Sequence, residues 1–180
     1  MAKKVLIIST SLRSGSNSEA LADAFLQGAS EAGNQTEKIS LKGKNIQFCR
    51  GCLACIRTKQ CVIKDDVPEI AEKMRVADVI VFASPIYYYE MSGQMKTLLD
   101  RANSLYKSEY AFRDIYFLSS AAEDGEQVDS RAIGGLGGWI DCYPKARFAG
   151  KVFAGGVDDA GKMEGHPALE KAYRMGKAIT

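Results

Sequence analysis

Two patterns of apolar positions alternate along the chain. Continuous apolar runs at Val5–Ser9 and Val79–Ala83 are typical of strands that are buried on both faces of a sheet. After the first run, apolar residues recur at the three- and four-residue spacing of an amphipathic helix, beginning with Leu21. The full pattern predicts five strands, at Val5–Ser9, Gln35–Leu41, Val79–Ala83, Ile115–Ser119 and Arg147–Ala154.

A helix is predicted after each of these strands. The first begins near Ser16, whose spacing from Glu19 matches a capping box, and it ends at Gly33. Strands that alternate with helices form a parallel sheet that is covered on both faces. We therefore predict one α/β domain over residues 1–180, an open doubly wound five-stranded sheet of order 2-1-3-4-5. The remaining helices are expected at about Val67–Arg75, Ser92–Tyr106, from beyond Val128 to Tyr143, and Pro167–Ile179.

Composition and charge exclude several classes of function. The chain carries 24 Lys and Arg residues against 22 Asp and Glu, a formal net charge of +2, which gives no argument for binding nucleic acid. No apolar run approaches the ~20 residues that a membrane helix needs. The first apolar run is too short for a signal peptide, so we expect a cytoplasmic protein.

The segment between the first strand and its helix, residues 10–18, is rich in hydroxyls and is called the phosphate loop below. A helix N-terminus at this place in a doubly wound sheet attracts an anion. The loop matches neither G-x-G-x-x-G nor G-x-x-x-x-G-K-[ST], which leaves a monophosphate such as that of FMN as the expected ligand. The alternative is a well-capped turn with solvated serines. The loop offers one cation, Arg13, and the hydroxyls of Thr10, Ser11, Ser14, Ser16 and Ser18.

A second loop, Ser84–Lys96, follows the third predicted strand and is called the tyrosine loop. In a sheet of order 2-1-3-4-5 the ligand crevice opens between the ends of strands one and three. Pro85 stiffens the turn, and the three tyrosines at 87–89 offer aromatic rings that can pack beside an isoalloxazine. The alternative is a surface cluster or a dimer contact.

Together with the cysteine-rich segment, these stretches resemble a known family. Ser11–Ser18, Ser84–Arg101, Cys49–Asp66 and the tail Gly165–Tyr173 are similar to the NADPH-dependent FMN reductases of flavodoxin-like fold, and especially to their iron–sulfur flavoprotein branch. Many relatives have Gly-Ser-Pro-Arg where this chain has Thr10-Ser11-Leu12-Arg13, which leaves the path of the phosphate loop open.

The resemblance implies which residues bind FMN. Phosphate contacts fall on Ser11, Arg13, Asn17 and Ser18, to which Ser16 is added as a hydroxyl of the same loop. Ring contacts fall on Pro85, Ile86, Tyr87 and Tyr88. A further loop near the ring maps to Ser119–Asp124, in which we select Ser119, Ala121 and Asp124.

Four of the five cysteines lie within thirteen residues of a long polar loop, Lys42–Asp66, called the cysteine loop below. Clustered cysteines in a reducing compartment indicate a metal site or redox chemistry. Three interpretations remain: a 4Fe–4S cluster, a metal-free loop packed by small buried cysteines, or a structural zinc site, whose usual second knuckle is missing. The candidate ligands are Cys49, Cys52, Cys55 and Cys61.

The functional hypotheses follow from these sites. In the first, NAD(P)H reduces bound FMN, which passes electrons to a quinone, a nitro or azo compound, or a free flavin. In the second, a 4Fe–4S cluster passes single electrons between a ferredoxin-like donor and FMN. The third is a flavin- or thiol-based redox sensor. The partner is a small-molecule acceptor or a redox protein, and the resemblance implies a homo-oligomer, a dimer or tetramer.

Other conspicuous residues have structural explanations. His166 precedes Pro167 at a helix start, where we expect a capping or surface role. Cys142 is expected to pack on its helix. Asp65 and Asp66 are expected to cap the helix that begins near Val67.

Overall fold

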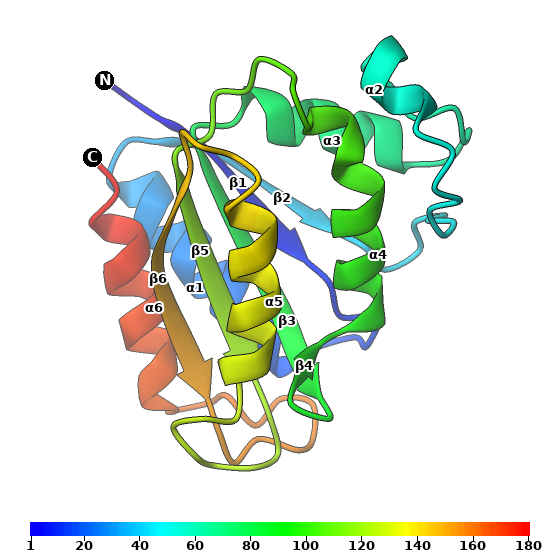
Figure 1. Ribbon diagram of the computed structural model, residues 1–180. Helices are drawn as coiled ribbons and strands as arrows, with labels where there is room; N and C mark the ends of the chain where they lie inside the picture. Colours follow the sequence, from blue (N-terminus) through cyan, green and yellow to red (C-terminus); the bar gives the residue numbers. More distant parts are fainter.

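The computed structural model describes all 180 residues and contains one parallel sheet (Figure 1). The sheet has the order β2-β1-β3-β5-β6, and a short strand, β4, pairs antiparallel with the end of β3. Without β4, this order is the predicted 2-1-3-4-5. The strands are β1 Lys4–Ser9, β2 Gln35–Ser40, β3 Val79–Tyr87, β4 Glu90–Met91, β5 Asp114–Ser120 and β6 Arg147–Ala154.

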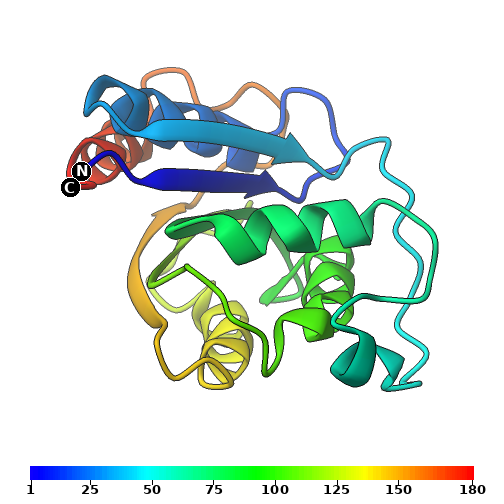
Figure 2. The ribbon, with the colours of Figure 1, turned by 90° about the horizontal axis from the view of Figure 1, so that it is seen from above.

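Helices cover both faces of the sheet, as Figure 2 shows. α1 and α6 lie on one face, and α3, α4 and α5 lie on the other. α2 is a single short helix that stands apart from the sheet beside α3 and α4. The helices are α1 Asn17–Glu31, α2 Ala54–Thr58, α3 Val67–Val76, α4 Gly93–Arg101, α5 Ser130–Ile140 and α6 Pro167–Lys177, with a 3-10 turn, η1, at Ala102–Leu105.

The central strands are apolar in sequence because both of their faces are buried. Ile7 and Ile8 of β1 are completely buried, and they point to opposite faces of the sheet. β2 is an edge strand, and Ile39 is its only buried residue.

On the first face, α1 and α6 touch at two glycines. A Cβ on Gly28 would stand 2.0 Å from the carbonyl oxygen of Tyr173, and a Cβ on Gly176 would stand 2.1 Å from that of Phe25. The backbones of the two helices are therefore in direct contact, which only glycine permits at these positions. This contact holds α1, and with it the phosphate loop, against the sheet.

The structure corrects two predicted boundaries. The tyrosine loop is strand as far as Tyr87, because Ser84 and Pro85 continue the ladder to β5 and Ile86 pairs with Met91. The result is a tight β3–β4 hairpin rather than a loop. The helix predicted over Ser92–Tyr106 ends at Arg101 and continues as η1.

The structure also contradicts two expectations about how the cysteines pack, one for the cysteine loop and one for Cys142. Cys49 and Cys52 are exposed and Cys55 and Cys61 are half-buried, so the metal-free interpretation is wrong in one part, the expectation that small buried cysteines pack the loop. Cys142 is exposed as well and lies beyond the end of α5, so it does not pack in the core.

The capping roles were predicted with mixed success. His166 caps α6 by accepting a hydrogen bond from the Ala168 N–H, at 3.1 Å. Asp65 Oδ1 accepts the Val67 N–H at 3.1 Å, as expected of a cap. Asp66 makes no such bond and accepts instead from the Asn45 N–H, at 2.6 Å.

Candidate functional site

A cleft of about 190 Å³ opens at the carboxyl ends of β1, β3 and β5. This is the place where doubly wound sheets bind their ligands. Eight of the twelve predicted FMN-binding residues line it, together with four that the sequence reasoning did not select. The predicted ones are Ser11, Arg13, Ser16, Asn17, Pro85, Ile86, Tyr87 and Ala121; the others are Ser120, Ala122, Val157 and Asp158.

The remaining four predicted residues lie outside the cleft. Ser18 is completely buried, with its hydroxyl 3.5 Å from that of Ser16. Ser119 donates a hydrogen bond to the buried carboxylate of Asp129 at 3.1 Å. Tyr88 is 96% exposed at the tip of the hairpin. Asp124 packs against the backbone of the β6–α6 connection, where a Cβ on Gly155 would stand 2.5 Å from its Oδ1.

Hydrogen bonds of buried hydroxyl groups hold the phosphate loop in place. The Thr10 hydroxyl donates to the Ala83 carbonyl at 3.1 Å and lies 2.9 Å from the hydroxyl of Ser92, the N-cap of α4. The Ser16 Oγ accepts the Glu19 N–H at 3.2 Å, which confirms the predicted cap of α1. The Thr10 bonds therefore join the phosphate loop to β3 and to the start of α4, and the Ser16 bond fixes the start of α1.

The side of the phosphate loop that lines the cleft offers hydrogen-bond donors to a ligand. The first N–H groups of α1 have no partner within the helix, and they lie at its positive end. The hydroxyls of Ser11 and Ser16 accept bonds from the Arg13 and Glu19 N–H groups, so the proton of each hydroxyl remains to be donated. The Oδ1 of Asn17 is buried without a hydrogen-bond partner.

The β3–β4 hairpin forms the second wall. Tyr88 and Tyr89 occupy its two turn positions with φ of 50° and 67°, a left-handed conformation that glycine and asparagine adopt more readily. The Tyr89 hydroxyl donates to the Glu123 carboxylate at 2.8 Å, and the Arg131 guanidinium lies 5.5 Å from the ring centroid. The bond to Glu123 raises the pKa of Tyr89. Tyr89 thus anchors the hairpin and leaves Tyr87 beside the cleft.

The third wall comes from the β6–α6 loop, residues 155–166. Val157 and Asp158 line the cleft. The Asp159 N–H bonded to the Asp158 carboxylate holds the pKa of that carboxyl below its usual range, so it is anionic at neutral pH. Sequence reasoning missed this loop, although β6 is parallel to β5 and its carboxyl end must reach the same edge of the sheet.

Sequence reasoning also missed Lys42, which it placed in the cysteine loop. β2 ends two residues before Lys42, and β2 is parallel to β1 in register, with Ser40 opposite Ser9. This register brings the Lys42 ammonium group into contact with the Ser14 hydroxyl of the phosphate loop. A second cation therefore stands at the phosphate loop besides Arg13.

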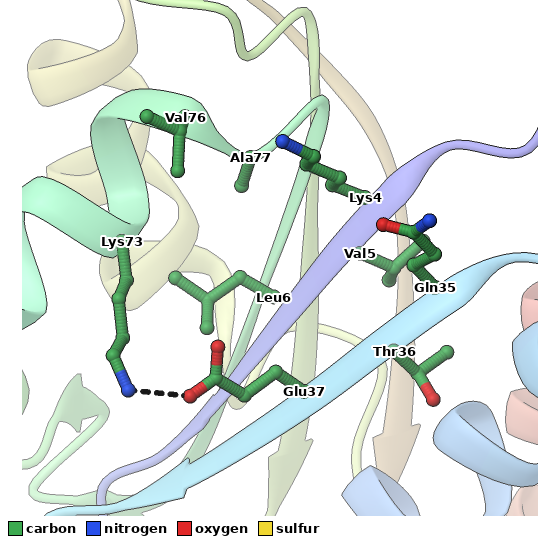
Figure 3. Close-up of a pocket in the computed structure, with 9 residues that line it drawn as sticks. All are labelled: Lys4, Val5, Leu6, Gln35, Thr36, Glu37, Lys73, Val76 and Ala77. Carbon is green, nitrogen blue, oxygen red and sulfur yellow. Dashed lines mark hydrogen bonds and ion pairs between the residues drawn. The ribbon is translucent and has the colours of Figure 1, made fainter.

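A separate groove of about 250 Å³ lies between β1, β2 and α3, as Figure 3 shows. The Lys73 ammonium spans it and pairs with the Glu37 carboxylate at 2.6 Å. The strand residues that line it are the first three of β1 and of β2. It is therefore at the opposite end of the strands from the cleft, and two of its three charged side chains, Lys73 and Glu37, are paired with each other.

All four clustered cysteines line one small cavity between the cysteine loop and the end of α4. The Asn103 Nδ2 donates to the Cys55 sulfur at 3.3 Å, and the Cys61 thiol lies beside the Arg101 guanidinium. No three sulfurs form a compact group around one point that could hold a single metal ion. A zinc ion binds all its ligands at one centre, so this arrangement does not support the zinc interpretation.

A buried ion pair fixes this cavity to the body of the protein. Arg101 donates to both carboxylate oxygens of Asp65, at 2.7 and 2.9 Å, and to the Gln47 carbonyl at 2.6 Å. Both side chains are completely buried. Burial alone would raise the pKa of Asp65, but the bonds from Arg101 and from the backbone N–H groups of Gln47 and Val67 outweigh burial and lower it.

None of the helices has the length and apolar character needed to cross a bilayer. The family model described as NADPH-dependent FMN reductase matches residues 3–136. An iron–sulfur flavoprotein of Methanosarcina thermophila is 38% identical over 62% of this chain and 58% of its own length. The chain spans about half the length of the iron–sulfur flavoproteins it matches.

Two further proteins match nearly the whole chain. A putative NAD(P)H-dependent FMN-containing oxidoreductase of Bacillus subtilis is 26% identical over 96% of both chains. The structure of an NAD(P)H:quinone oxidoreductase from Methanothermobacter marburgensis superposes with a TM-score of 0.78, at 20% identity, over 98% of this chain and 96% of that one. The latter likeness supports the predicted flavodoxin-like fold.

Proposed function

Since the chain belongs to the NADPH-dependent FMN reductase family, we propose that it binds FMN in the cleft at the ends of β1, β3 and β5 and uses it as an oxidoreductase. NAD(P)H is the proposed electron donor. A quinone, a nitro or azo compound, or a free flavin is the proposed acceptor. The observation that carries this proposal is the convergence of the phosphate loop, the β3–β4 hairpin, residues 120–122 at the end of β5 and the β6–α6 loop on one cleft.

The donors and acceptors of the cleft fit FMN. Backbone N–H groups at the start of α1 and the protons of Ser11 and Ser16 suit a phosphate dianion. The buried Oδ1 of Asn17 lacks a donor, and a ribityl hydroxyl would supply one. At about 190 Å³ the cleft is smaller than the ~300 Å³ or more that encloses a whole ligand, which suits a flavin whose ring lies against the surface beside Tyr87.

In this proposal the protein's own residues bind and orient. Bound FMN would accept a hydride at its ring and release electrons to the acceptor. Pro85 and Ile86 present the end of β3 to the ring edge, and the Tyr89–Glu123 bond keeps the hairpin in place. No side chain of the cleft needs to act as a general acid or base, and an exposed ring face leaves room for donor and acceptor to stack.

The direct test is a titration of the purified protein with FMN, followed by the visible flavin spectrum. We expect saturable binding at one FMN per chain, and NAD(P)H should then bleach the flavin bands. Tyr87→Ala should weaken binding, whereas Tyr88→Ala is the matched control, because Tyr88 is 96% exposed at the hairpin tip. Absence of binding by the wild-type protein would refute the proposal.

The cysteine cavity supports a second candidate function, electron transfer through a 4Fe–4S cluster. Four cysteines are the ligand set that such a cluster takes, and each would bind a different iron, so they need not surround one point. Anaerobic reconstitution with iron and sulfide, with Cys55→Ser as control, tests it. About four irons per wild-type chain would support the cluster, and fewer than one would refute it.

The proposal of an FMN-binding oxidoreductase also includes self-association of the protein as a dimer or tetramer. The exposed tyrosines at the hairpin tip, 54% exposed at Tyr87 and 96% at Tyr88, lie beside the cleft and offer an aromatic contact surface. Light scattering on the eluted protein measures the mass directly. A monomer at micromolar concentration, with FMN bound, would refute this part alone.

A further inference from the structure

The β6–α6 loop is tied to the phosphate loop by side-chain and backbone bonds. The Asn17 amide donates to the Asp159 carbonyl at 2.8 Å and to the Val157 carbonyl at 3.3 Å. The Gly161 N–H donates to the Gly15 carbonyl at 3.2 Å. The two loops are more than 130 residues apart in sequence, and the β6–α6 loop lies outside the part of the chain that the family model matches. Together they form one continuous rim around the cleft.

Arg13 belongs to this connection. Its Nη1 donates to the Asp158 carbonyl at 3.0 Å, and its Nη2 lies 3.5 Å from the Asp159 carboxylate. A guanidinium that already faces a carboxylate brings little net positive charge to a nearby phosphate. The Asp158 carboxylate on the same side is itself paired with the Lys162 ammonium group, at 3.6 Å.

Lys42 differs from Arg13 in its charge environment. It contacts the Ser14 hydroxyl in the middle of the phosphate loop, and no carboxylate lies within ion-pair distance of its ammonium group. A lysine ammonium is a compact charge on a flexible stem, so it can follow an anion that the loop binds. The unpaired cation at the phosphate loop therefore lies on the side of β2, whereas the charged groups on the side of β6 are paired with one another.

We propose that Lys42 supplies the cation that binds the phosphate of the flavin nucleotide, while Arg13 is a positioning residue that, with the amide nitrogen of Asn17, holds the β6–α6 loop as the wall of the cleft. This inference rests on the proposed FMN site and assigns its phosphate specificity. It departs from the resemblance, which places a phosphate contact on Arg13.

Comparison of FMN with riboflavin separates the two roles, because riboflavin lacks only the phosphate. Lys42→Gln should weaken FMN binding about fivefold at low salt and leave riboflavin binding unchanged. The loss should shrink as the salt concentration rises, since the ammonium group is exposed. Arg13→Gln should weaken FMN and riboflavin by the same factor, because the whole wall is loosened. Both dissociation constants come from quenching of flavin fluorescence.

The outcomes are distinguishable. If Arg13→Gln lowers the preference for FMN over riboflavin while Lys42→Gln does not, the assignment is reversed and the inference is wrong. If neither variant changes that preference, the backbone N–H groups and the serine hydroxyls bind the phosphate without a cation, and the role of Lys42 is refuted. Failure of the wild-type protein to bind either flavin would refute the FMN site itself, and this inference with it. Asp159→Asn should behave like Arg13→Gln; an unchanged affinity for both flavins would overturn the positioning role.

Discussion

The cleft at the strand ends and the cavity among the cysteines are both formed by loops, but different forces hold them. The cleft is built on three parallel strands in register and on α1, which two glycines fix against α6. The cysteine loop runs from β2 to α3 without a strand, and the buried Asp65–Arg101 pair is its main charged link to α4. The sheet itself therefore positions the cleft, whereas a single ion pair does much to hold the cysteine cavity in place.

This difference means that the two sites should respond separately to mutation. Damage to the α1–α6 contact should spread to the phosphate loop, because the loop continues directly into α1. Damage to the ion pair should affect the cysteine loop first, and it should leave the strand ends in place.

The largest expected effect comes from Asp65→Ala. It leaves the completely buried Arg101 guanidinium without its carboxylate, which should lower the free energy of unfolding by about 3–5 kcal/mol. Urea denaturation followed by circular dichroism measures the loss. The double variant Asp65→Leu/Arg101→Met is the comparison: it removes both buried charges, so it should lose less stability than Asp65→Ala, although the Gln47 and Val67 N–H groups lose their acceptor in both. A loss below about 1 kcal/mol in Asp65→Ala would show that water reaches the pair.

The second-largest expected effect concerns the cleft and the α1–α6 contact that supports it. Gly28→Ala forces a methyl group against the backbone of α6, so the free energy of unfolding should fall by about 1–3 kcal/mol, and FMN affinity should fall with it. Gly134→Ala on α5 is the control, because its Cβ meets nothing within 4 Å, and helix propensity predicts a gain of up to about 1 kcal/mol. Equal unfolding curves for the two variants would contradict the close contact of α1 with α6.

A smaller effect is expected from Ser16→Ala, which removes the cap of α1. The loss of the bond to the Glu19 N–H should lower stability by about 1 kcal/mol. Because the same hydroxyl lines the cleft, FMN binding should weaken while the iron content of a reconstituted sample stays constant. A change in iron content would show that the two regions are coupled.

The smallest effect is one of pH. The pKa of Asp65 is lowered in the folded protein, so its contribution to stability is complete above the pKa of an unfolded aspartate, about 3.9, and is lost as the pH falls through the lower folded value. Below pH 4, therefore, the stability advantage of the wild-type protein over Asp65→Asn should decrease. Denaturant midpoints at pH 3 and pH 6 provide the measurement, and an unchanged difference would contradict the shift.

The fold could be predicted because the same sequence pattern, an apolar run at each strand that is buried on both faces, recurs along the chain. Three segments are largely apolar because their strands are buried on both faces of the sheet, and all three strands are confirmed: Val5–Ser9, Val79–Ala83 and Ile115–Ser119. The hairpin at Tyr87 was missed because the left-handed turn carries Tyr88 and Tyr89 instead of glycine or asparagine, so no turn signal precedes β4.

The candidate site was only partly accessible from sequence. Residues of the phosphate loop and of the tyrosine loop could be selected because they directly follow apolar strands. Val157 and Lys42 could not, since their places depend on which strands are neighbours and on register, which are tertiary properties. The cysteine spacing indicated a site, yet nothing in it indicated that Arg101, forty residues later, would lie beside Cys61.

Trp139 is the single tryptophan of the chain, and it packs edge-on against Phe82 of β3 with ring centroids 6.0 Å apart. Three residues after Phe82, the same strand reaches the cleft at Pro85. Tryptophan emission overlaps flavin absorption, so the protein contains its own donor for resonance energy transfer. Occupancy of the cleft can accordingly be followed by the intrinsic fluorescence of one residue, without a label and without turnover.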